Sequence, residues 1–567
     1  MDDRKILAAR GGLRPTLLSA ESRKKVSPSR QSPGGRLQFV RAKKVALLFA
    51  LLLSPLADCA PDRSFHLMEA SIADIHQAML AGTLTCRDLV HQYLDRIRAY
   101  DQDGPAINSM LYINPASLQQ ADAMDQDFKR THKLKPLACV PIVLKDNFDT
   151  ADMPTTAGAR TLKGAQPEKD AFAVKRLREA GALILGKSNL QEFASGGISV
   201  SSLGGQVKNP YDLTRTPGGS SGGTGAAVAA NFAAAGTGSD TGGSVRSPSS
   251  ANSLVGLRPT RGLISRDGIV PVSFTQDTIG PMTRTVADTA RILDVMVGYD
   301  PNDPVTAFSV GNIPKTYTAF LKNGLQGARL GLLTNLLGSG PEYEPVNAVI
   351  AKAVDALKQQ GAVIVPLDDP LLETKSLTAN FRLNEPEFKA ALNGYLQQQG
   401  SRVPVHSLAE IIASGNYHKP TLEKFFATAQ SYEDGPNSPD YKDRRIKMEE
   451  IKIEVANLMA KNQLDALIYP HQKCLVLPIG ATFQKDRNGV IAALAGFPAI
   501  EVPAGFSTPT PEAPIGVPVG LEFLGRAWAE PELLKLAFGF EQTTHYRKPP
   551  VSTPALARSE PQKNRIH

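Results

Sequence analysis

The stretch at residues 216–245 reads TPGGSSGGTGAAVAANFAAAGTGSDTGGSV, with Asp240 as its one charged residue. Glycine pairs bracket serines in GGSSGG and again in GGS. Such a run is expected where the backbone approaches a ligand closely and hydroxyl groups face it. Ser220 and Ser221 can cap a helix over 224–235, because the alanine-rich run between the turns contains strong helix formers. The stretch therefore predicts two serine-bearing turns around one helix, with a chemical site at the turns.

Two other interpretations of this stretch fit it less well. A phosphate-binding loop needs a lysine after its glycines, or a third glycine to complete GxGxxG, and neither is present. A flexible linker explains the glycine and serine content but not the helix-forming run AAVAANFAAA. A serine nucleophile is the interpretation that remains.

A serine nucleophile needs a base within hydrogen-bond reach. No histidine lies between His132 and His406, so a histidine base would have to arrive through tertiary contact. Lysine is the alternative, provided burial lowers its pKa far enough to populate the neutral amine. The run VPIVLKDN predicts a buried strand with Lys145 at its carboxyl end, where α/β sites are built. Taken alone, Lys145 is more simply interpreted as a solvated residue at a strand end.

The three motifs VPIVLKDN, PGGSSGG and GSDTGGSVRSP together resemble the amidase signature family in its Ser-Ser-Lys order and spacing. Lys145 precedes Ser220 by 75 residues, and Ser220 precedes Ser244 by 24. The resemblance covers about residues 65–550 and is weakest over about 300–460. It implies a single large α/β/α domain, with a mixed central sheet flanked by helices.

The resemblance also implies the role of each site residue. Ser244 is the acylated nucleophile, Ser220 the proton shuttle behind a cis peptide bond, and Lys145 the base. The oxyanion hole consists of the backbone N–H groups of Thr241, Gly242, Gly243 and Ser244, where glycine lets donors approach the developing charge. Supporting roles in hydrogen bonding, capping and orientation fall to Asp146, Asn147, Ser221, Asp240 and Arg246.

Some positions depart from the family pattern. Ala138 and Cys139 stand where the family usually has His-Gly before the lysine strand. Glu501 replaces a serine or threonine, and His471 replaces a threonine. We expect Glu501 and His471 to lie away from the three catalytic residues and to affect substrate or packing.

The net charge of +8 comes from the N-terminus. Residues 1–44 hold 12 basic and three acidic residues, which leaves 51 basic against 52 acidic residues in the remainder. A nearly neutral remainder without a basic stripe argues against nucleic-acid binding.

The basic head is followed by an apolar run at 45–57 and by small residues, a pattern typical of a secretory signal and too short to span a bilayer. We therefore expect 1–60 to be an extension with a signal-like segment, 61–550 to be the amidase domain and 551–567 to be a disordered tail. The protein is then periplasmic or secreted. An uncleaved anchor, lipid attachment at Cys59 and a true start near Val40 are the alternatives.

Four cysteines occur, at positions 59, 86, 139 and 474, without a C-x-x-C pair. We expect no disulfide framework, at most one bridge, and Cys139 as a packed thiol. The nine histidines form no ligand motif, so we predict no metal and no cofactor. Regular elements are expected as a helix capped at Thr85 with Asp88 in its first turn, a helix over 171–180 and a strand over 182–186.

The function favoured by the sequence is hydrolysis of a linear carboxamide to a carboxylate and ammonia or an amine. SRDGIVPVSFTQDTIGPM and NEPEFKAALNGYL are similar to bacterial peptide amidases, which remove C-terminal amide groups. The substrate is then a small-molecule or peptide amide, and a homodimer is compatible with the sequence. The alternatives are the glutaminase subunit of a glutamyl-tRNA amidotransferase and a catalytically inactive binding module.

Overall fold

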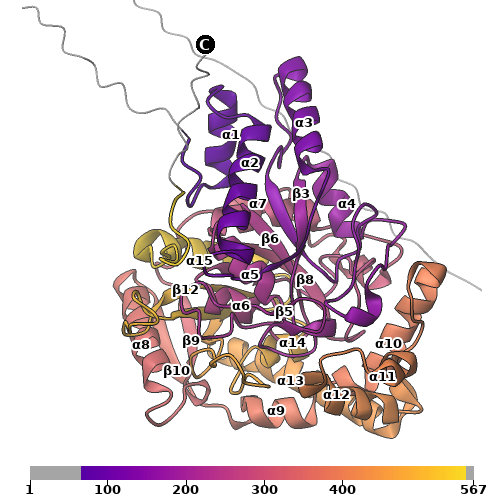
Figure 1. The fold of residues 1–567 in the computed structure, drawn as a ribbon. Helices are drawn as coiled ribbons and strands as arrows, with labels where there is room; N and C mark the ends of the chain where they lie inside the picture. Colours follow the sequence, from indigo (N-terminus) through magenta and orange to yellow (C-terminus); the bar gives the residue numbers. More distant parts are fainter. Residues whose placement is uncertain (1–64, 557–567) are drawn as a thin grey trace, which may run out of the picture. The chain divides into compact units, whose positions relative to one another are not determined.

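The computed structural model describes residues 65–556. Within them, eleven strands form one mixed sheet flanked by helices (Figure 1). This architecture confirms the expected fold class. In spatial order the strands are β1 (Met110–Ile113), β3 (Leu183–Ser188), β2 (Pro141–Lys145), β6 (Ala235–Asp240), β8 (Thr278–Thr283), β7 (Val255–Arg258), β12 (Ala499–Phe506), β13 (Pro518–Leu524), β11 (Ala466–Pro470), β9 (Arg329–Leu333) and β10 (Val363–Leu367).

The sheet mixes parallel and antiparallel pairs. β2 lies parallel to both β3 and β6, whereas β6, β8, β7, β12, β13 and β11 pair antiparallel in succession. β1 closes one edge antiparallel to β3, and β9 and β10 continue the other edge in parallel. A separate short hairpin joins β4 (Val200–Ser201) and β5 (Gly205–Gln206). Because β2 and β6 are parallel neighbours, their carboxyl ends meet at one edge of the sheet.

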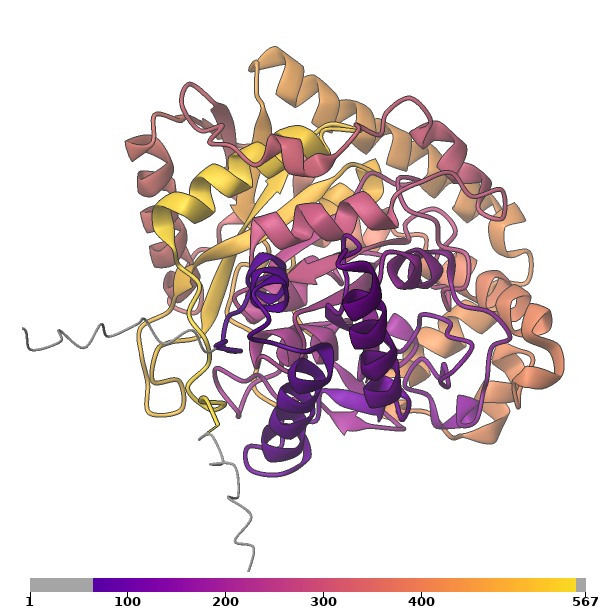
Figure 2. The ribbon, with the colours of Figure 1, turned by 90° about the horizontal axis from the view of Figure 1, so that it is seen from above.

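The helices pack around this sheet. Their bounds are α1 (Ile72–Leu80), α2 (Cys86–Ile97), α3 (Ser117–Thr131), α4 (Phe172–Glu179), α5 (Gly222–Ala229), α6 (Arg246–Ala251), α7 (Val286–Met296), α8 (Glu344–Gln359), α9 (Thr374–Asn380), α10 (Asn384–Gln399), α11 (Leu408–Ser414), α12 (Lys419–Ser431), α13 (Pro439–Lys461), α14 (Val490–Ala495) and α15 (Glu530–Thr544). α7, α8 and α15 contact the strands β8 and β12, and α5 and α6 contact β6 and β7. α10, α11 and α12 gather at one side of the sheet (Figure 1, Figure 2) around their own apolar cluster.

The regular elements expected from local sequence are present. α2 begins after Thr85, whose side chain accepts a hydrogen bond from the Asp88 N–H. α4 and β3 occupy the segments predicted at 171–180 and 182–186, and β2 ends on Lys145. The serine- and glycine-rich stretch differs from expectation: α5 ends at Ala229, and Ala235 already begins β6. Pairing of β6 with β2 overrides the helix propensity of the last alanines.

Three further features bear on the expectations. Cys86 and Cys139 form a disulfide, with 5.6 Å between their Cα atoms, so the prediction of Cys139 as a free packed thiol was wrong. Packing extends past 550, because Arg96 donates to the carbonyl groups of Thr553 and Pro554. Among residues 65–556, no helix combines the length and apolar character required to cross a bilayer. The signal-like segment at 45–57 lies outside the described residues.

Candidate functional site

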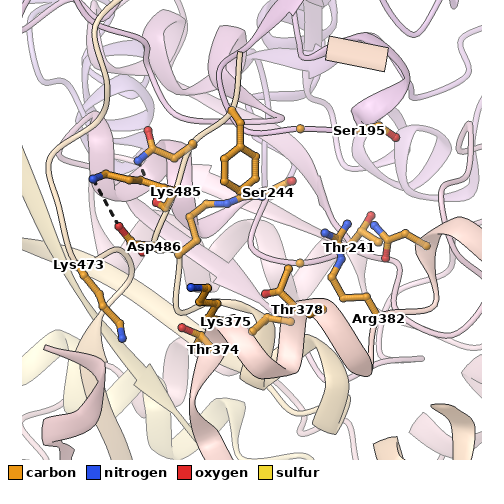
Figure 3. A pocket seen from close by; sticks show the side chains of 18 of the residues that line it. Ser195, Thr241, Ser244, Thr374, Lys375, Thr378, Arg382, Lys473, Lys485 and Asp486 are labelled. Atoms are coloured by element: carbon orange, nitrogen blue, oxygen red, sulfur yellow. Dashed lines mark hydrogen bonds and ion pairs between the residues drawn. The ribbon is translucent and has the colours of Figure 1, made fainter. Parts of the chain in front are cut away.

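Ser244 lies on the wall of a cavity of about 400 Å³, in the turn between β6 and α6. Thr241 and Gly242 of the same turn also line this cavity. Figure 3 shows Lys375, which lies on α9, and Arg382, which lies in the loop after it, around the same cavity as Ser244 and Thr241. The turn therefore presents a hydroxyl group to a space large enough for a small substrate.

Lys145 and Ser220 are joined directly. The Lys145 side-chain nitrogen lies 2.7 Å from the Ser220 hydroxyl oxygen, and both side chains are fully buried. The Gly219–Ser220 peptide bond is cis. The backbone N–H of Ser221 donates to the Ser244 carbonyl at 3.3 Å, so the two serine-bearing turns lie side by side. Lys145 and Ser220, 75 positions apart, thus meet at the carboxyl end of β2, and the residue after Ser220 contacts the backbone of Ser244 in the turn after β6.

The surroundings of Lys145 favour a neutral amine. Burial lowers its pKa to about 7, against the opposing influence of the Asp240 and Asp277 carboxylates. Among the described residues, no carboxylate lies within ion-pair distance of its nitrogen. Its second close partner is the Ser239 hydroxyl at 2.8 Å. Lys145 is therefore placed to exchange a proton with Ser220 near neutral pH.

In the turn at residues 241–244, only some of the backbone N–H groups are free to donate a hydrogen bond to a substrate oxyanion. The Gly243 N–H donates to an Asp240 carboxylate oxygen at 2.8 Å, so this member of the expected oxyanion hole already has an acceptor. The N–H groups of Gly242 and Ser244 have none within residues 65–556. A side chain at Gly242 would project into open space, consistent with a donor facing the cavity. The geometry thus favours Gly242 and Ser244, beside Thr241, over Gly243.

The family of the chain follows from comparison with known proteins. The family model described as Amidase matches residues 88–534. This chain belongs to the amidase family. A probable amidase of Arabidopsis thaliana is 37% identical over 510 residues, which cover 86% of this chain and 92% of that protein. A glutamyl-tRNA(Gln) amidotransferase subunit of Chloroflexus aggregans is 34% identical, with 85% and 98% covered.

Solved structures agree with this assignment. The native peptide amidase of Stenotrophomonas maltophilia is 39% identical, covers 86% of this amidase and 99% of its own chain, and superposes with a TM-score of 0.78. A bacterial aryl acylamidase shares the fold, with a TM-score of 0.72 at 22% identity. The protein is accordingly an enzyme of the amidase family that acts on amide C–N bonds.

Asp240 and Arg246 brace the nucleophile turn of this amidase. The Asp240 carboxylate accepts the N–H groups of Gly243 and Val245 and pairs with Arg246 at 3.0 Å and Arg258 at 2.7 Å. Although burial alone would raise the pKa of Asp240, the two guanidinium groups hold it well below its usual range. A permanent carboxylate therefore fixes the backbone around Ser244.

The other supporting residues act at different distances from the relay. The Asn147 amide donates to the Ser239 hydroxyl at 3.0 Å, which links it to Lys145 through one side chain. Asp146 instead pairs with Lys187 at 3.1 Å and makes no direct contact with the relay. Ser221 does not cap α5 with its side chain, which donates to the Ser239 carbonyl at 3.3 Å.

Ser239 was missed by sequence reasoning. It lies one residue before Asp240 on β6, and its hydroxyl group contacts Lys145. No signal in the sequence points to Ser239, because its contact with Lys145 depends on the parallel pairing of β2 with β6.

His471 lies against the nucleophile turn, contrary to its expected place away from the catalytic residues. A Cβ atom on Gly243 would stand 2.7 Å from the imidazole of His471. The Nδ1 atom of His471 lies 2.7 Å from one carboxylate oxygen of Glu522, and the other oxygen accepts from Arg246. The sequence does not reveal this contact, because Gly243, His471 and Glu522 come from distant strands and turns.

Glu501 completes this buried cluster behind the turn. It lies directly opposite Glu522 on neighbouring strands, and polar atoms of His471, Glu501 and Glu522 lie within 4.8 Å of one another. The sequence contains no metal-ligand motif, so it did not predict that these three residues lie together. Burial and the Glu522 carboxylate raise the pKa of Glu501 well above its usual range, which favours its protonated form. A carboxyl and a carboxylate thus face each other, with Arg246 balancing the charge.

Proposed function

We propose that this amidase hydrolyses linear carboxamides through an acyl-enzyme on Ser244. The observation that carries the proposal is the 2.7 Å contact between Lys145 and Ser220, in surroundings that lower the lysine pKa to about 7. A neutral Lys145 takes the proton of Ser220, and Ser220 takes the proton of Ser244 as its oxygen attacks the carbonyl carbon.

The same groups complete the reaction. When the tetrahedral intermediate collapses, the C–N bond breaks and Ser220 delivers its proton to the leaving nitrogen. Water then attacks the ester on Ser244, the relay accepts a proton from the water, and the carboxylate departs as Ser244 regains its hydrogen. The N–H groups of Gly242 and Ser244 stabilise the oxyanion in both steps. One amide and one water yield one carboxylic acid and one amine or ammonia, and the acid then gives its proton to the nitrogen product to leave a carboxylate and an ammonium ion.

We propose C-terminal amides of peptides as the substrate type. The similarity to the peptide amidase of Stenotrophomonas maltophilia over nearly its whole chain supports this choice. The test is ammonia release from amidated peptides, with Ser244→Ala and Lys145→Met as matched variants. We expect both to lose activity, by roughly 10⁴-fold or more for Ser244→Ala. Unchanged turnover in Ser244→Ala would refute the mechanism.

A glutaminase that works inside a larger complex is the second candidate, because subunits of glutamyl-tRNA(Gln) amidotransferases match at 31–34% identity over most of their length. In that case a second protein co-purifies with the native enzyme, and glutamine is its preferred amide. A homodimer is distinguished from such a complex by mass measurement on the purified protein.

We also propose that the protein works outside the cytoplasm. The Cys86–Cys139 disulfide supports an oxidising compartment, in agreement with the signal-like sequence at 45–57. Cell fractionation tests the location, and thiol titration of native protein tests the bridge. Recovery in the cytoplasm with both cysteines reduced would overturn the proposal.

A further inference from the structure

The cavity in front of Ser244 carries an excess of positive charge. Its lining includes the cations Lys375, Arg382, Lys473, Lys485 and Arg487 but only two carboxylates, Glu373 and Asp486. Figure 3 shows several of these labelled side chains around the cavity. An uncharged amide does not require such surroundings. The cations that lack a partner carboxylate within the protein are therefore the ones available to bind a negatively charged group of the substrate.

Both carboxylates of the cavity are already engaged. Glu373 accepts the N–H of Ser376 at 2.8 Å and lies 3.8 Å from the Lys473 ammonium. Asp486 accepts the hydroxyl of Tyr343 at 3.1 Å and lies 3.9 Å from Lys485, which also pairs with Glu342 outside the cavity lining. Lys473 and Lys485 are therefore neutralised within the protein.

Of the three remaining cations, Lys375 is exposed to solvent, whereas Arg382 and Arg487 are half-buried, and none of the three has such a counter-charge among the described residues. Within residues 65–556, neither guanidinium forms an ion pair, and Arg382 makes no side-chain hydrogen bond. Arg487 has one long contact, 3.5 Å to the Gly219 carbonyl. Burial, together with the neighbouring Arg382 charge, lowers the pKa of Arg487 to about 10. Two half-buried guanidinium groups that line the same catalytic cavity without a counter-charge are suited to binding an anion.

The position of this arginine pair shows which part of a substrate it would meet. Arg487 contacts the carbonyl of Gly219, the residue joined directly to Ser220. A side chain at Gly197 would approach the Arg487 guanidinium to 2.8 Å, so this glycine leaves the group room beside the relay. An anion held here would lie near the Ser220 end of the relay. Because ammonia is the leaving group of the proposed reaction, such a charge would belong to the acyl part of the substrate.

We propose that Arg382 and Arg487 form a carboxylate subsite, so that the substrate is a short carboxamide whose acyl part carries a carboxylate. Among peptides, this is a C-terminal amide on an acidic residue. The inference rests on the proposed amidase activity and names the class of substrate for the same site. Guanidinium groups bind carboxylates in a planar, bidentate manner, which lysine cannot reproduce.

The test compares N-acetyl-L-glutamic acid α-amide with its γ-methyl ester, which differ in one charge. We expect kcat/KM to favour the acid by about 10- to 100-fold, since a hydrogen bond between charged groups contributes that much. In Arg487→Gln and Arg382→Gln the acid-to-ester ratio should fall toward one. Lys485→Gln removes a neutralised charge from the same cavity and should keep the ratio. Arg382→Gln loses no hydrogen bond, so it guards against misfolding of the other variant.

A binding measurement separates this proposal from the catalytic one. N-acetyl-L-glutamate and its dimethyl ester are titrated calorimetrically into Ser244→Ala, with and without each arginine substitution. Equal hydrolysis of acid and ester, or a ratio unaffected by the arginines, overturns the subsite and leaves the amidase function standing. Absence of hydrolysis together with arginine-dependent binding of the acid supports the subsite and overturns the catalytic proposal. Neither hydrolysis nor binding overturns both.

Discussion

Replacing Lys145 with methionine should stabilise the fold while abolishing activity. Lys145 is fully buried without a carboxylate partner among the described residues, so the protein holds an ionisable amine where its charge is disfavoured. Methionine has a similar length and no charge to desolvate. A catalytic group retained at the expense of stability is expected at an active site.

The magnitude follows from the pKa of Lys145, which falls from 10.5 to about 7 in the folded protein. At about 1.4 kcal/mol per pKa unit, burial of the charged amine costs about 5 kcal/mol. Loss of the hydrogen bonds to Ser220 and Ser239 reduces this gain by about 1 kcal/mol for each bond. We therefore expect Lys145→Met to raise the free energy of unfolding by about 2–3 kcal/mol at pH 6.

The pH dependence supplies an independent check. Below pH 7 the amine is protonated in both states, and the full penalty applies. Between pH 7 and 10.5 the unfolded chain binds more protons than the folded one, so the stability of the native enzyme rises with pH. The advantage of Lys145→Met should accordingly be greatest below pH 7 and shrink toward pH 10.5.

Urea denaturation at pH 6, 8 and 10 measures this difference. Lys187→Met is the matched control, because Lys187 is equally buried but pairs with Asp146 at 3.1 Å. Its replacement leaves a carboxylate uncompensated and should destabilise the protein by about 3–5 kcal/mol. A Lys145→Met protein that is less stable than the native one at pH 6, or equally affected at all pH values, would refute the reasoning.

The remaining predictions concern the nucleophile turn, the two buried glutamates behind it and the disulfide. Gly243→Ala forces a methyl group to within 2.7 Å of His471, and we expect ammonia release to fall by roughly 100-fold; normal rates would show that the turn tolerates the shift. Glu501→Gln should change the free energy of unfolding by less than about 1 kcal/mol at pH 5. Because the pKa of Glu501 is raised in the folded protein, the native protein should lose stability as the pH rises, and the Gln variant should become more stable relative to it. Glu522→Gln should instead cost about 3–5 kcal/mol; equal melting temperatures of the two variants would contradict this contrast. Cys139→Ser removes a disulfide that spans 53 residues and should lower the free energy of unfolding, measured by urea denaturation, by about 4 kcal/mol. Dithiothreitol should lower the stability of the native protein by the same amount and leave that of the variant unchanged.

Local patterns in the sequence predicted the elements that carry the chemistry. The apolar run ending on Lys145 became β2, and Thr85 capped α2, because strand length, hydrophobic pattern and capping depend on neighbouring residues alone. The two glycine-rich turns likewise had to be turns. The length of the helix between them was not determined by local sequence, because α5 ends at Ala229 and the chain enters β6, which pairs with the neighbouring strand β2.

The sequence by itself therefore determined which residues form the turns and the strand end, and through family resemblance the candidate Ser-Ser-Lys relay. Only the tertiary structure decided what surrounds them. Parallel pairing of β2 and β6 placed Ser239 on Lys145, and distant segments brought His471 to Gly243, Arg382 and Arg487 to one cavity, and Cys86 to Cys139. The charge state of a group depends on burial and on neighbours in space, which residue order does not express.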